Sequence, residues 1–259
     1  MSLGMVIKAP EGIVLSAESR VTLAATPPAG PPIHVNFDNA TKLFGFNSPH
    51  NYVGVVTYGL AAIGLRTAHS FLPEFEATLP GDRLTIAEFA KQLSNFYLAQ
   101  WNVSPPPNYT GPQMTFLVAG YDNNQPYGRV YQFDIPNVPN PVEHQSGGFG
   151  LTWGGQREMV DRLLQGYDNN LPGLLTANLG LNPTQQTALN TTLQQLQLPI
   201  PLQALPLQDC VNLALFFLNT TILGQRLTVG IRGCGGEIDV AVVTRREGFK
   251  FLRRKELHA

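Results

Sequence analysis

The chain has 259 residues, a net charge of −1 and only 14% charged residues. This balance creates no field that would attract nucleic acid or an anionic membrane, and the length is ample for a buried core. Two cysteines, Cys210 and Cys234, are too few for a disulfide framework, and the five histidines show no metal-ligand spacing. We therefore expect no cofactor, no metal and no nucleic-acid partner.

Neither a secretory signal nor a membrane span is expected. The first residues lack a basic segment followed by an apolar one. The longest apolar stretch, Val211–Leu218, is interrupted by Asn212 and is much shorter than the roughly 20 residues that a span needs. We expect a soluble, cytoplasmic protein.

A β-hairpin is predicted at the start of the chain. Residues 4–8 and 12–18 are short apolar runs, and the turn residues Pro10 and Gly12 lie between them. Residues 24–35 hold four prolines, which exclude a helix or a central strand. We expect a loop there that borders the functional site.

A strand is predicted over residues 40–44. Side chains alternate along a strand, so Ala40, Lys42 and Phe44 share one face. If Lys42 faces a site, the other two are expected to face it as well.

The next strand, over residues 53–58, ends at Gly59. A helix is predicted to begin near Leu60. A backbone N–H at a helix N-terminus is a ready donor to a developing negative charge, so Gly59 is a candidate for that role.

The remaining sequence alternates helices and strands. Thr85 and Glu88 form a capping box before an amphipathic helix that runs to about Trp101. The other predicted elements are strands over 114–122, 128–136 and 149–155, helices from Gln156 and over 183–197 and 204–222, and closing strands over 227–232 and 237–244.

Ser2, Glu18 and Lys42 are the candidate catalytic residues. A Ser behind the initiator Met is exposed when that Met is removed, and it then carries a hydroxyl nucleophile and its own α-amine, a base with a pKa of about 7.7–8.0. An ammonium such as Lys42, held by an acid such as Glu18, would lower the pKa of the hydroxyl. The alternative is that Ser2 is only a common small second residue.

The sequence around these residues resembles the proteasome β-type subunits and the related bacterial N-terminal nucleophile (Ntn) hydrolases. The run VIKAPEGIVLSAESRVT is similar to the start of the mature subunits, TKLFGF is similar to their KKIF strand, and VGVVTYGLAAIG is similar to their oxyanion-hole turn. The likeness runs from residue 2 to about residue 64 and continues weakly to about residue 246.

The resemblance implies a role for each matched position. Ser2 takes the place of the nucleophile, Glu18 of the acid, Lys42 of the catalytic lysine and Gly59 of the oxyanion-hole glycine. The pocket for the residue before the cut would be apolar, which implies cleavage after hydrophobic residues, and its implied lining is Val21, Thr22, Ala40, Phe44 and Thr57.

The resemblance also implies a fold and partners. It implies one domain over 1–259 in the α+β class, a four-layer α-β-β-α sandwich with an inserted helical segment near 168–205. The implied enzyme is a threonine/serine-type endopeptidase that assembles as a homo-oligomer of stacked rings and cleaves peptides or unfolded proteins. An ATPase partner is left open.

Two departures from the family pattern keep other functions open. The bridge before the last strand commonly carries an Asp and a Ser that orient the N-terminal residue, and Arg232 and Gly235 stand there. Gly154 and Gly155 stand where the family often has a Ser. The alternatives are a ring-forming subunit without activity and an Ntn amidohydrolase that acts on a non-peptide amide.

Overall fold

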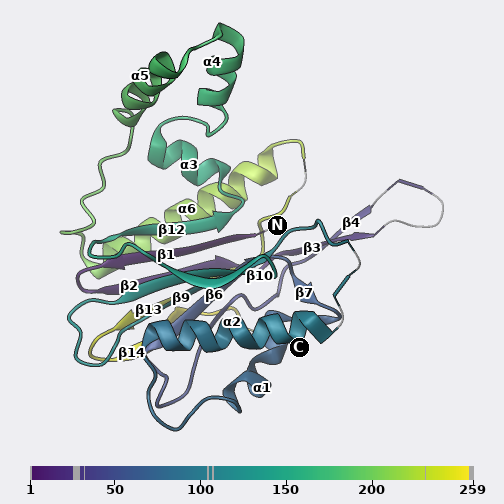
Figure 1. The fold of residues 1–259 in the computed structure, drawn as a ribbon, viewed down its shortest axis with the longest axis vertical. Coiled ribbons are helices and arrows are strands. Elements are labelled where there is room, and N and C mark those ends of the chain that lie inside the picture. The colour runs from purple at the N-terminus through teal and green to yellow at the C-terminus, as the bar shows by residue number, and fades with distance from the viewer. Residues whose placement is uncertain are drawn as a thin grey trace.

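A computed structural model describes residues 2–25, 30–31, 33–103, 105–106, 108–230 and 232–256. Two five-stranded antiparallel sheets form the centre of the described chain (Figure 1). The first sheet has the order β12 (Gly150–Gly155), β1 (Leu3–Ala9), β2 (Gly12–Glu18), β13 (Ile238–Thr244) and β14 (Gly248–Arg253). The second has the order β11 (Val138–His144), β10 (Arg129–Ile135), β9 (Met114–Gly120), β6 (Val53–Gly59) and β5 (Leu43–Gly45).

Two small sheets and the helices complete the described chain. The small sheets pair β3 (Val21–Ala25) with β4 (Ile33–Phe37) and β7 (Ala62–Ile63) with β8 (Arg66–Thr67). The helices are a 3-10 turn, η1 (Ala68–Phe71), and six α-helices: α1 (Leu72–Glu76), α2 (Ile86–Val103), α3 (Glu158–Gln165), α4 (Leu171–Leu179), α5 (Pro183–Gln194) and α6 (Leu207–Leu227).

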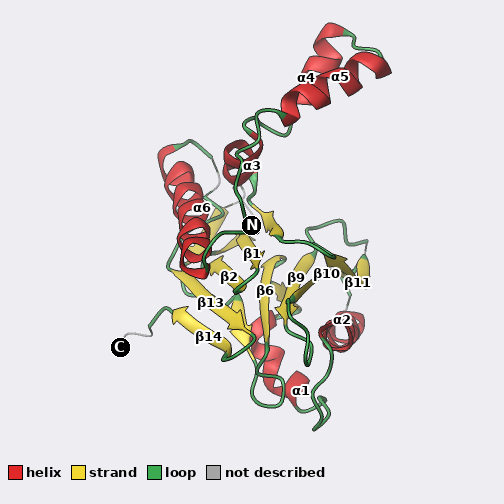
Figure 2. Ribbon diagram, turned by 90° about the vertical axis from the view of Figure 1, so that its left-hand side faces the viewer, coloured by secondary structure: helices red, strands yellow, loops and turns green. Residues whose placement is uncertain are grey.

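Three clusters of buried side chains hold these elements together. Between the two large sheets, Val6 and Leu15 of the first sheet pack with Leu117 of the second. On its other face the first sheet packs under α6, where Met5 meets Phe217. The second sheet packs in the same way under α1 and α2, as the end-on view of the strands shows (Figure 2). Every residue of β1 and β2 is buried, because both faces of these strands are covered.

Most predicted elements are present in the structure. The first hairpin, the strands β6, β9, β10, β12 and β13, and the helices α2, α3, α5 and α6 all form within a few residues of their predicted ranges. The capping box is also present, because the Thr85 N–H donates to Glu88 at 2.9 Å and the Glu88 N–H donates to the Thr85 hydroxyl at 3.3 Å.

Some local predictions are wrong. Residues 21–25 and 33–37 pair as a ribbon, so strands enter both ends of the segment predicted as a loop over 24–35. The predicted strand over 227–232 is absent from its described residues, because α6 continues to Leu227 and bends follow it. The strand paired with β13 at the sheet edge is instead β14.

The expected four-layer α-β-β-α sandwich is wrong as a description of this chain. The described residues form a mixed α/β structure with four antiparallel sheets and six α-helices. The β3–β4 ribbon and the α4–α5 pair stand away from the large sheets (Figures 1 and 2). The resemblance behind the expectation covers residues 2–64 best, and the family pattern has no counterpart of the inserted segment that forms α4 and α5.

One described helix, α6, is long and apolar enough to cross a membrane by length and composition alone. It instead packs one side on the first sheet, where Cys210, Ala214 and Phe217 are fully buried. Its other side carries exposed Phe216 and Leu223, so the helix is buried on one side only.

Candidate active site

The first hairpin brings Ser2 and Glu18 together. Gly4 pairs with Ala17 across β1 and β2, which places Ser2 beside the end of β2 where Glu18 lies. Lys42 reaches the same point from the second sheet, immediately before β5. The three predicted catalytic residues therefore meet at one end of the gap between the large sheets, and all three side chains are buried.

The Lys42 ammonium is surrounded by three acceptors. Its Nζ donates to Ser2 Oγ at 2.8 Å, to the Glu18 carboxylate and to the Arg20 carbonyl. An ammonium has three N–H donors, and this geometry uses all of them. Burial lowers the pKa of Lys42 from its ordinary value of 10.5, while the charge of Glu18 opposes that shift. The site thus holds a cation directly on the Ser2 hydroxyl.

Glu18 is fixed by the backbone around it. Its carboxylate accepts from the N–H groups of Leu3 at 3.3 Å, Arg20 at 2.7 Å and Gly235 at 3.0 Å, besides the Lys42 ammonium. A buried carboxylate with this many donors is satisfied and cannot rotate freely. Glu18 therefore fixes the position of Lys42.

Arg232 and Gly235 lie in the bridge before β13, where the family pattern has an Asp and a Ser. They contribute backbone groups to the site in place of those side chains. The Gly235 N–H donates to Glu18, and the Arg232 carbonyl accepts from Arg20 at 3.4 Å. A Cβ on Gly235 would lie 2.4 Å from the Arg20 guanidinium, so glycine lets Arg20 lie against this bridge. The guanidinium also binds Asp38 through two hydrogen bonds of 2.6 and 2.7 Å.

Asp38 and the Gly235 amide were not among the predicted site residues. Asp38 follows the β3–β4 ribbon, and the Arg20–Asp38 pair closes that ribbon back onto the site. Arg20 was visible in the sequence only as the residue two positions after Glu18. The Arg20–Asp38 ion pair forms only because the β3–β4 ribbon returns to the site, so no local sequence pattern could have predicted it.

Gly59 directs its amide into the cleft beside Lys42. The Leu60 N–H donates to the Gln113 carbonyl at 2.8 Å, so Gly59 belongs to a non-hydrogen-bonded pair of the β6–β9 ladder. Its N–H points to the same edge as that of Thr57, which donates to the Lys42 carbonyl at 2.8 Å. A φ of +89° and the 2.1 Å approach of an added Cβ to Gln113 O require glycine here.

The helix predicted from Leu60 is wrong, so Gly59 is not at a helix N-terminus. Residues 62–67 form the β7–β8 hairpin around Gly64, whose φ is +58°. The first helical turn begins only at Ala68. Any stabilisation of negative charge at Gly59 must come from its own N–H and from Lys42, without a helix dipole.

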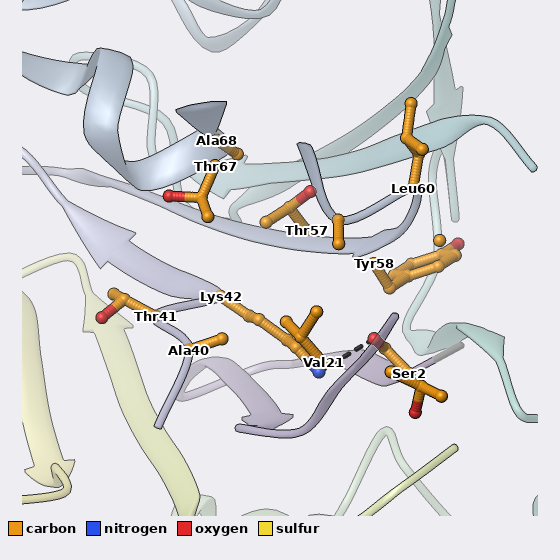
Figure 3. A pocket seen from close by; sticks show the side chains of 13 residues that line it. Ser2, Val21, Ala40, Thr41, Lys42, Thr57, Tyr58, Leu60, Thr67 and Ala68 are labelled. Atoms are coloured by element: carbon orange, nitrogen blue, oxygen red, sulfur yellow. Dashed lines mark hydrogen bonds between the residues drawn. The ribbon is translucent and has the colours of Figure 1, made fainter. Parts of the chain in front are cut away.

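A narrow pocket opens beside Ser2 Oγ (Figure 3). The Lys42 and Ser2 side chains meet at one end of it, and its volume is about 30 Å³. Of the predicted lining residues, Val21, Thr22, Ala40 and Thr57 are present, together with Thr41, Tyr58, Gly59, Leu60, Ala61, Thr67 and Ala68.

Phe44 does not line this pocket. It lies in the buried cluster under α1 and α2, with its ring 6.3 Å from that of His69. The strand predicted over 40–44 begins only at Leu43, so Lys42 and Phe44 do not share a strand face, and Phe44 packs next to His69 of η1. Thr57 does line the pocket, and its hydroxyl is buried without a hydrogen-bond partner in the described chain.

Gly154 and Gly155 support the main chain of Ser2. The Ser2 carbonyl accepts from the Gln156 N–H at 2.6 Å, and a Cβ on Gly155 would lie 1.7 Å from that carbonyl oxygen. Gly154 makes room for the Tyr58 hydroxyl, which an added Cβ would approach to 2.2 Å. These glycines hold Ser2 close to β12 through backbone contacts alone.

Cys234 lies next to the site without taking part in it. It is fully buried, and burial raises the pKa of its thiol above the ordinary value. A thiol in this state is a packing group and not a nucleophile. Among the described residues no three His, Cys, Asp or Glu side chains are grouped so that they could hold a metal ion.

Comparisons with known proteins place the fold. No protein-family profile and no curated protein matches the sequence. Among solved structures, Anbu from Pseudomonas aeruginosa, in a helical assembly, has a TM-score of 0.59 at 16% identity, with 99% of this chain and 88% of that chain covered. A Gly-1 mutant of Anbu from Hyphomicrobium sp. strain MC1 has a TM-score of 0.58 at 12% identity, covering 98% and 87%. A further structure of the Hyphomicrobium protein has a TM-score of 0.55 at 12% identity, covering 98% and 88%.

These findings correct the assignment to the proteasome β-type subunits. At 12–16% identity the likeness is one of fold alone, and it is to Anbu, a proteasome-related protein. The comparisons therefore show a likeness of fold to Anbu and leave the chemistry of the chain to be argued from the site.

Proposed function

We propose that the chain is a serine-type N-terminal nucleophile hydrolase that cleaves peptide bonds. The observation that carries the proposal is the buried contact of 2.8 Å between Lys42 Nζ and Ser2 Oγ, with Glu18 holding the lysine. A cation placed on a hydroxyl favours its ionised form and so activates it as a nucleophile. The mechanism requires that Ser2 become the first residue through removal of what precedes it.

Each step then has a group to perform it. Ser2 Oγ attacks the peptide carbonyl while the Ser2 α-amine takes the hydroxyl proton. The oxyanion that forms accepts from the Gly59 N–H and is stabilised by the positive charge of Lys42, whose N–H donors already have acceptors. The protonated amine passes its proton to the leaving nitrogen as the C–N bond breaks, which leaves an ester on Ser2. Water, deprotonated by the same amine, hydrolyses the ester and restores Ser2.

The pocket beside Ser2 favours a short side chain before the cut. Its volume of about 30 Å³ is small, and Val21, Ala40 and Ala68 make much of its wall apolar. The substrate class we propose is therefore a peptide or unfolded protein with a small or medium apolar residue at this position. A catalytically silent subunit is the weaker candidate, because Gly235 supplies Glu18 with a donor where the expected supporting side chains are missing.

The pH profile of peptide hydrolysis tests this mechanism. The α-amine must be unprotonated, and Lys42⁺ nearby pushes its pKa below about 8, so activity is expected to rise through roughly pH 6.5–7.5. Lys42 must stay protonated, and burial lowers its pKa from 10.5, so activity is expected to fall at a pH below that value. Hydrolysis of fluorogenic peptides by chains beginning at Ser2 should give this bell-shaped profile. A rate that does not change between pH 6 and pH 10 would contradict it.

We further propose that the chain forms a homo-oligomer. No Asp, Glu, Lys, Arg or His lies between Asp168 and Asp209, the stretch that includes the projecting α4–α5 pair. No residue of α4 is buried, and Leu174 and Leu179 are exposed by 56% and 66%. An exposed apolar surface without charge suits contact with another copy of itself, since no like charges are opposed.

Light scattering is expected to show several subunits at micromolar concentration. Leu174→Asp should shift the population toward smaller species, because it places a charge in the apolar face of α4. Thr191→Asp adds the same charge to the polar surface of α5 and serves as the control. A wild-type monomer at this concentration would rule out the assembly.

A further inference from the structure

A second, larger cleft lies on the other side of Tyr58 and Gly59 from the pocket beside Ser2. It has a volume of about 570 Å³ and runs between the ends of β9, β10, β11 and β12. Gly154 and Gly155, which hold the Ser2 main chain, form part of its wall. The side chains with polar atoms that line it are Tyr58, Gln113, Thr115, Gln132, Asp134, His144, Thr152, Trp153 and Arg157. We call it the β12 cleft.

Asp134 is a carboxylate in this cleft without a cationic partner in the described chain. It accepts from the Thr115 hydroxyl at 2.5 Å and only weakly from Gln132, at 3.5 Å. The one arginine of the cleft, Arg157, is bound to Asp161 at 2.7 Å. Thr115, whose hydroxyl donates to Asp134, pairs with Tyr58 across β9 and β6, so the carboxylate lies close to the wall that the two cavities share.

A second acceptor in the cleft has no donor. Gln113 Oε1 is buried and makes no hydrogen bond within the described part of the chain. A buried acceptor left without a donor costs about 1–3 kcal/mol. This oxygen is closed to solvent, so the Asp134 carboxylate alone presents negative charge to a ligand in the cleft, which fits a positively charged group rich in N–H donors.

The direction of the Ser2 main chain shows which part of a substrate this cleft would receive. Leu3 N–H points toward β2, where it donates to Glu18, while Ser2 O accepts from Gln156 N on the β12 side. Because N–H and C=O of one strand residue face the same edge, the Ser2 nitrogen also faces β12. The leaving nitrogen takes its proton from that amine, so the leaving fragment lies on the side of the β12 cleft.

We infer that the β12 cleft binds the fragment that follows the scissile bond and selects a Lys or Arg side chain on it through Asp134. The inference rests on the proposed peptidase function. An ammonium or guanidinium would pair with the Asp134 carboxylate, which would thereby gain a cationic partner. The narrow pocket would then bind a short apolar residue before the scissile bond, and the β12 cleft would bind a basic residue after it.

Quenched peptides that differ only at the first residue after the cut test the inference. Wild-type protein is expected to cleave the Lys peptide with a kcat/KM about tenfold above that of the acetyl-lysine peptide, which keeps the length and loses the charge. Asp134→Asn should remove this preference. Glu158→Gln, which removes the same charge from the exposed start of α3, should keep it. A preference that survives Asp134→Asn, or equal rates for both peptides with wild-type protein, overturns the inference.

Binding measurements separate this inference from the peptidase proposal. The Ser2→Ala chain is expected to bind a labelled Lys peptide about tenfold more tightly than its acetyl-lysine counterpart, and Asp134→Asn should abolish the difference. This result with a wild-type protein that cleaves nothing would reject the peptidase and keep the cation site, and equal binding of the two peptides would reject the site. If Asp134→Asn fails to fold, Gln113→Lys replaces it, since an ammonium in the cleft should remove the same discrimination.

Discussion

Lys42→Ala is expected to abolish peptide hydrolysis, with a loss of kcat of at least about a hundredfold. Lys42 is the cation that contacts Ser2 Oγ, and its Nζ is positioned by Glu18 and the Arg20 carbonyl. Without it the hydroxyl pKa returns toward that of an ordinary serine, and the oxyanion keeps only the Gly59 N–H. Fluorogenic peptide hydrolysis at the pH of maximal activity measures the loss.

The same substitution leaves Glu18 buried without its cation, which must be separated from the catalytic effect. Removing one partner of a buried pair costs about 3–5 kcal/mol of folding stability, and the three backbone donors on Glu18 reduce that cost. Lys42→Ala combined with Glu18→Gln removes the stranded charge, so this double variant should recover thermal stability without recovering turnover. Turnover at the wild-type rate in a folded Lys42→Ala chain would remove Lys42 from the mechanism.

The proximity of Ser2 and Glu18 could be predicted because it is local. A hairpin with a turn at Pro10 and Gly12 brings residues 2 and 18 together whatever the rest of the chain does. The contribution of Lys42 depends on how the two sheets face each other. Periodicity does not reveal that arrangement, and only the resemblance of TKLFGF to a known strand suggested it.

The parts of the site that the sequence did not predict involve backbone groups and contacts between residues far apart in the sequence. The Gly235 N–H reaches Glu18 from the far end of the chain, and a glycine offers no side chain from which such a contact could be inferred. Asp38 meets Arg20 because the β3–β4 ribbon returns to the site, and the proline-rich run between the strands suggested only a loop. Ile33–Phe37 is exposed at every residue, so no buried face marked it as a strand.

The helix predicted from Leu60 failed for a different reason. The run LAAIGL has good helix formers, and only Gly64 interrupts it. In the structure Gly64 adopts a left-handed conformation and turns the chain into the β7–β8 hairpin, so helical propensity was overruled at a single residue. This change affects the proposed catalysis, because Gly59 is not at a helix N-terminus and no helix dipole helps to stabilise an oxyanion there.

A chain that carries any uncleavable residue or tag before Ser2 is expected to be folded, assembled and inactive. The mechanism uses the Ser2 α-amine as the base, and attachment of another residue converts this amine into an amide that cannot accept a proton at neutral pH. General base catalysis contributes about 10²–10⁴-fold, so a loss of at least about a hundredfold in kcat is expected. Intact mass gives the fraction of chains that begin at Ser2, and peptide turnover should be proportional to that fraction.

A tag of the same size at the other end of the chain is the matched control, and it should leave turnover unchanged. The geometry predicts why the two ends differ. The Ser2 nitrogen faces the β12 edge, where Gln156 already holds the Ser2 carbonyl at 2.6 Å, so an added residue would start at the wall formed by Gly154 and Gly155. It would both remove the base and occupy the side from which the leaving nitrogen must be protonated. A chain with an intact N-terminal tag that cleaves peptides at the untagged rate would show that Ser2 is not the nucleophile, and the peptidase proposal would have to be abandoned.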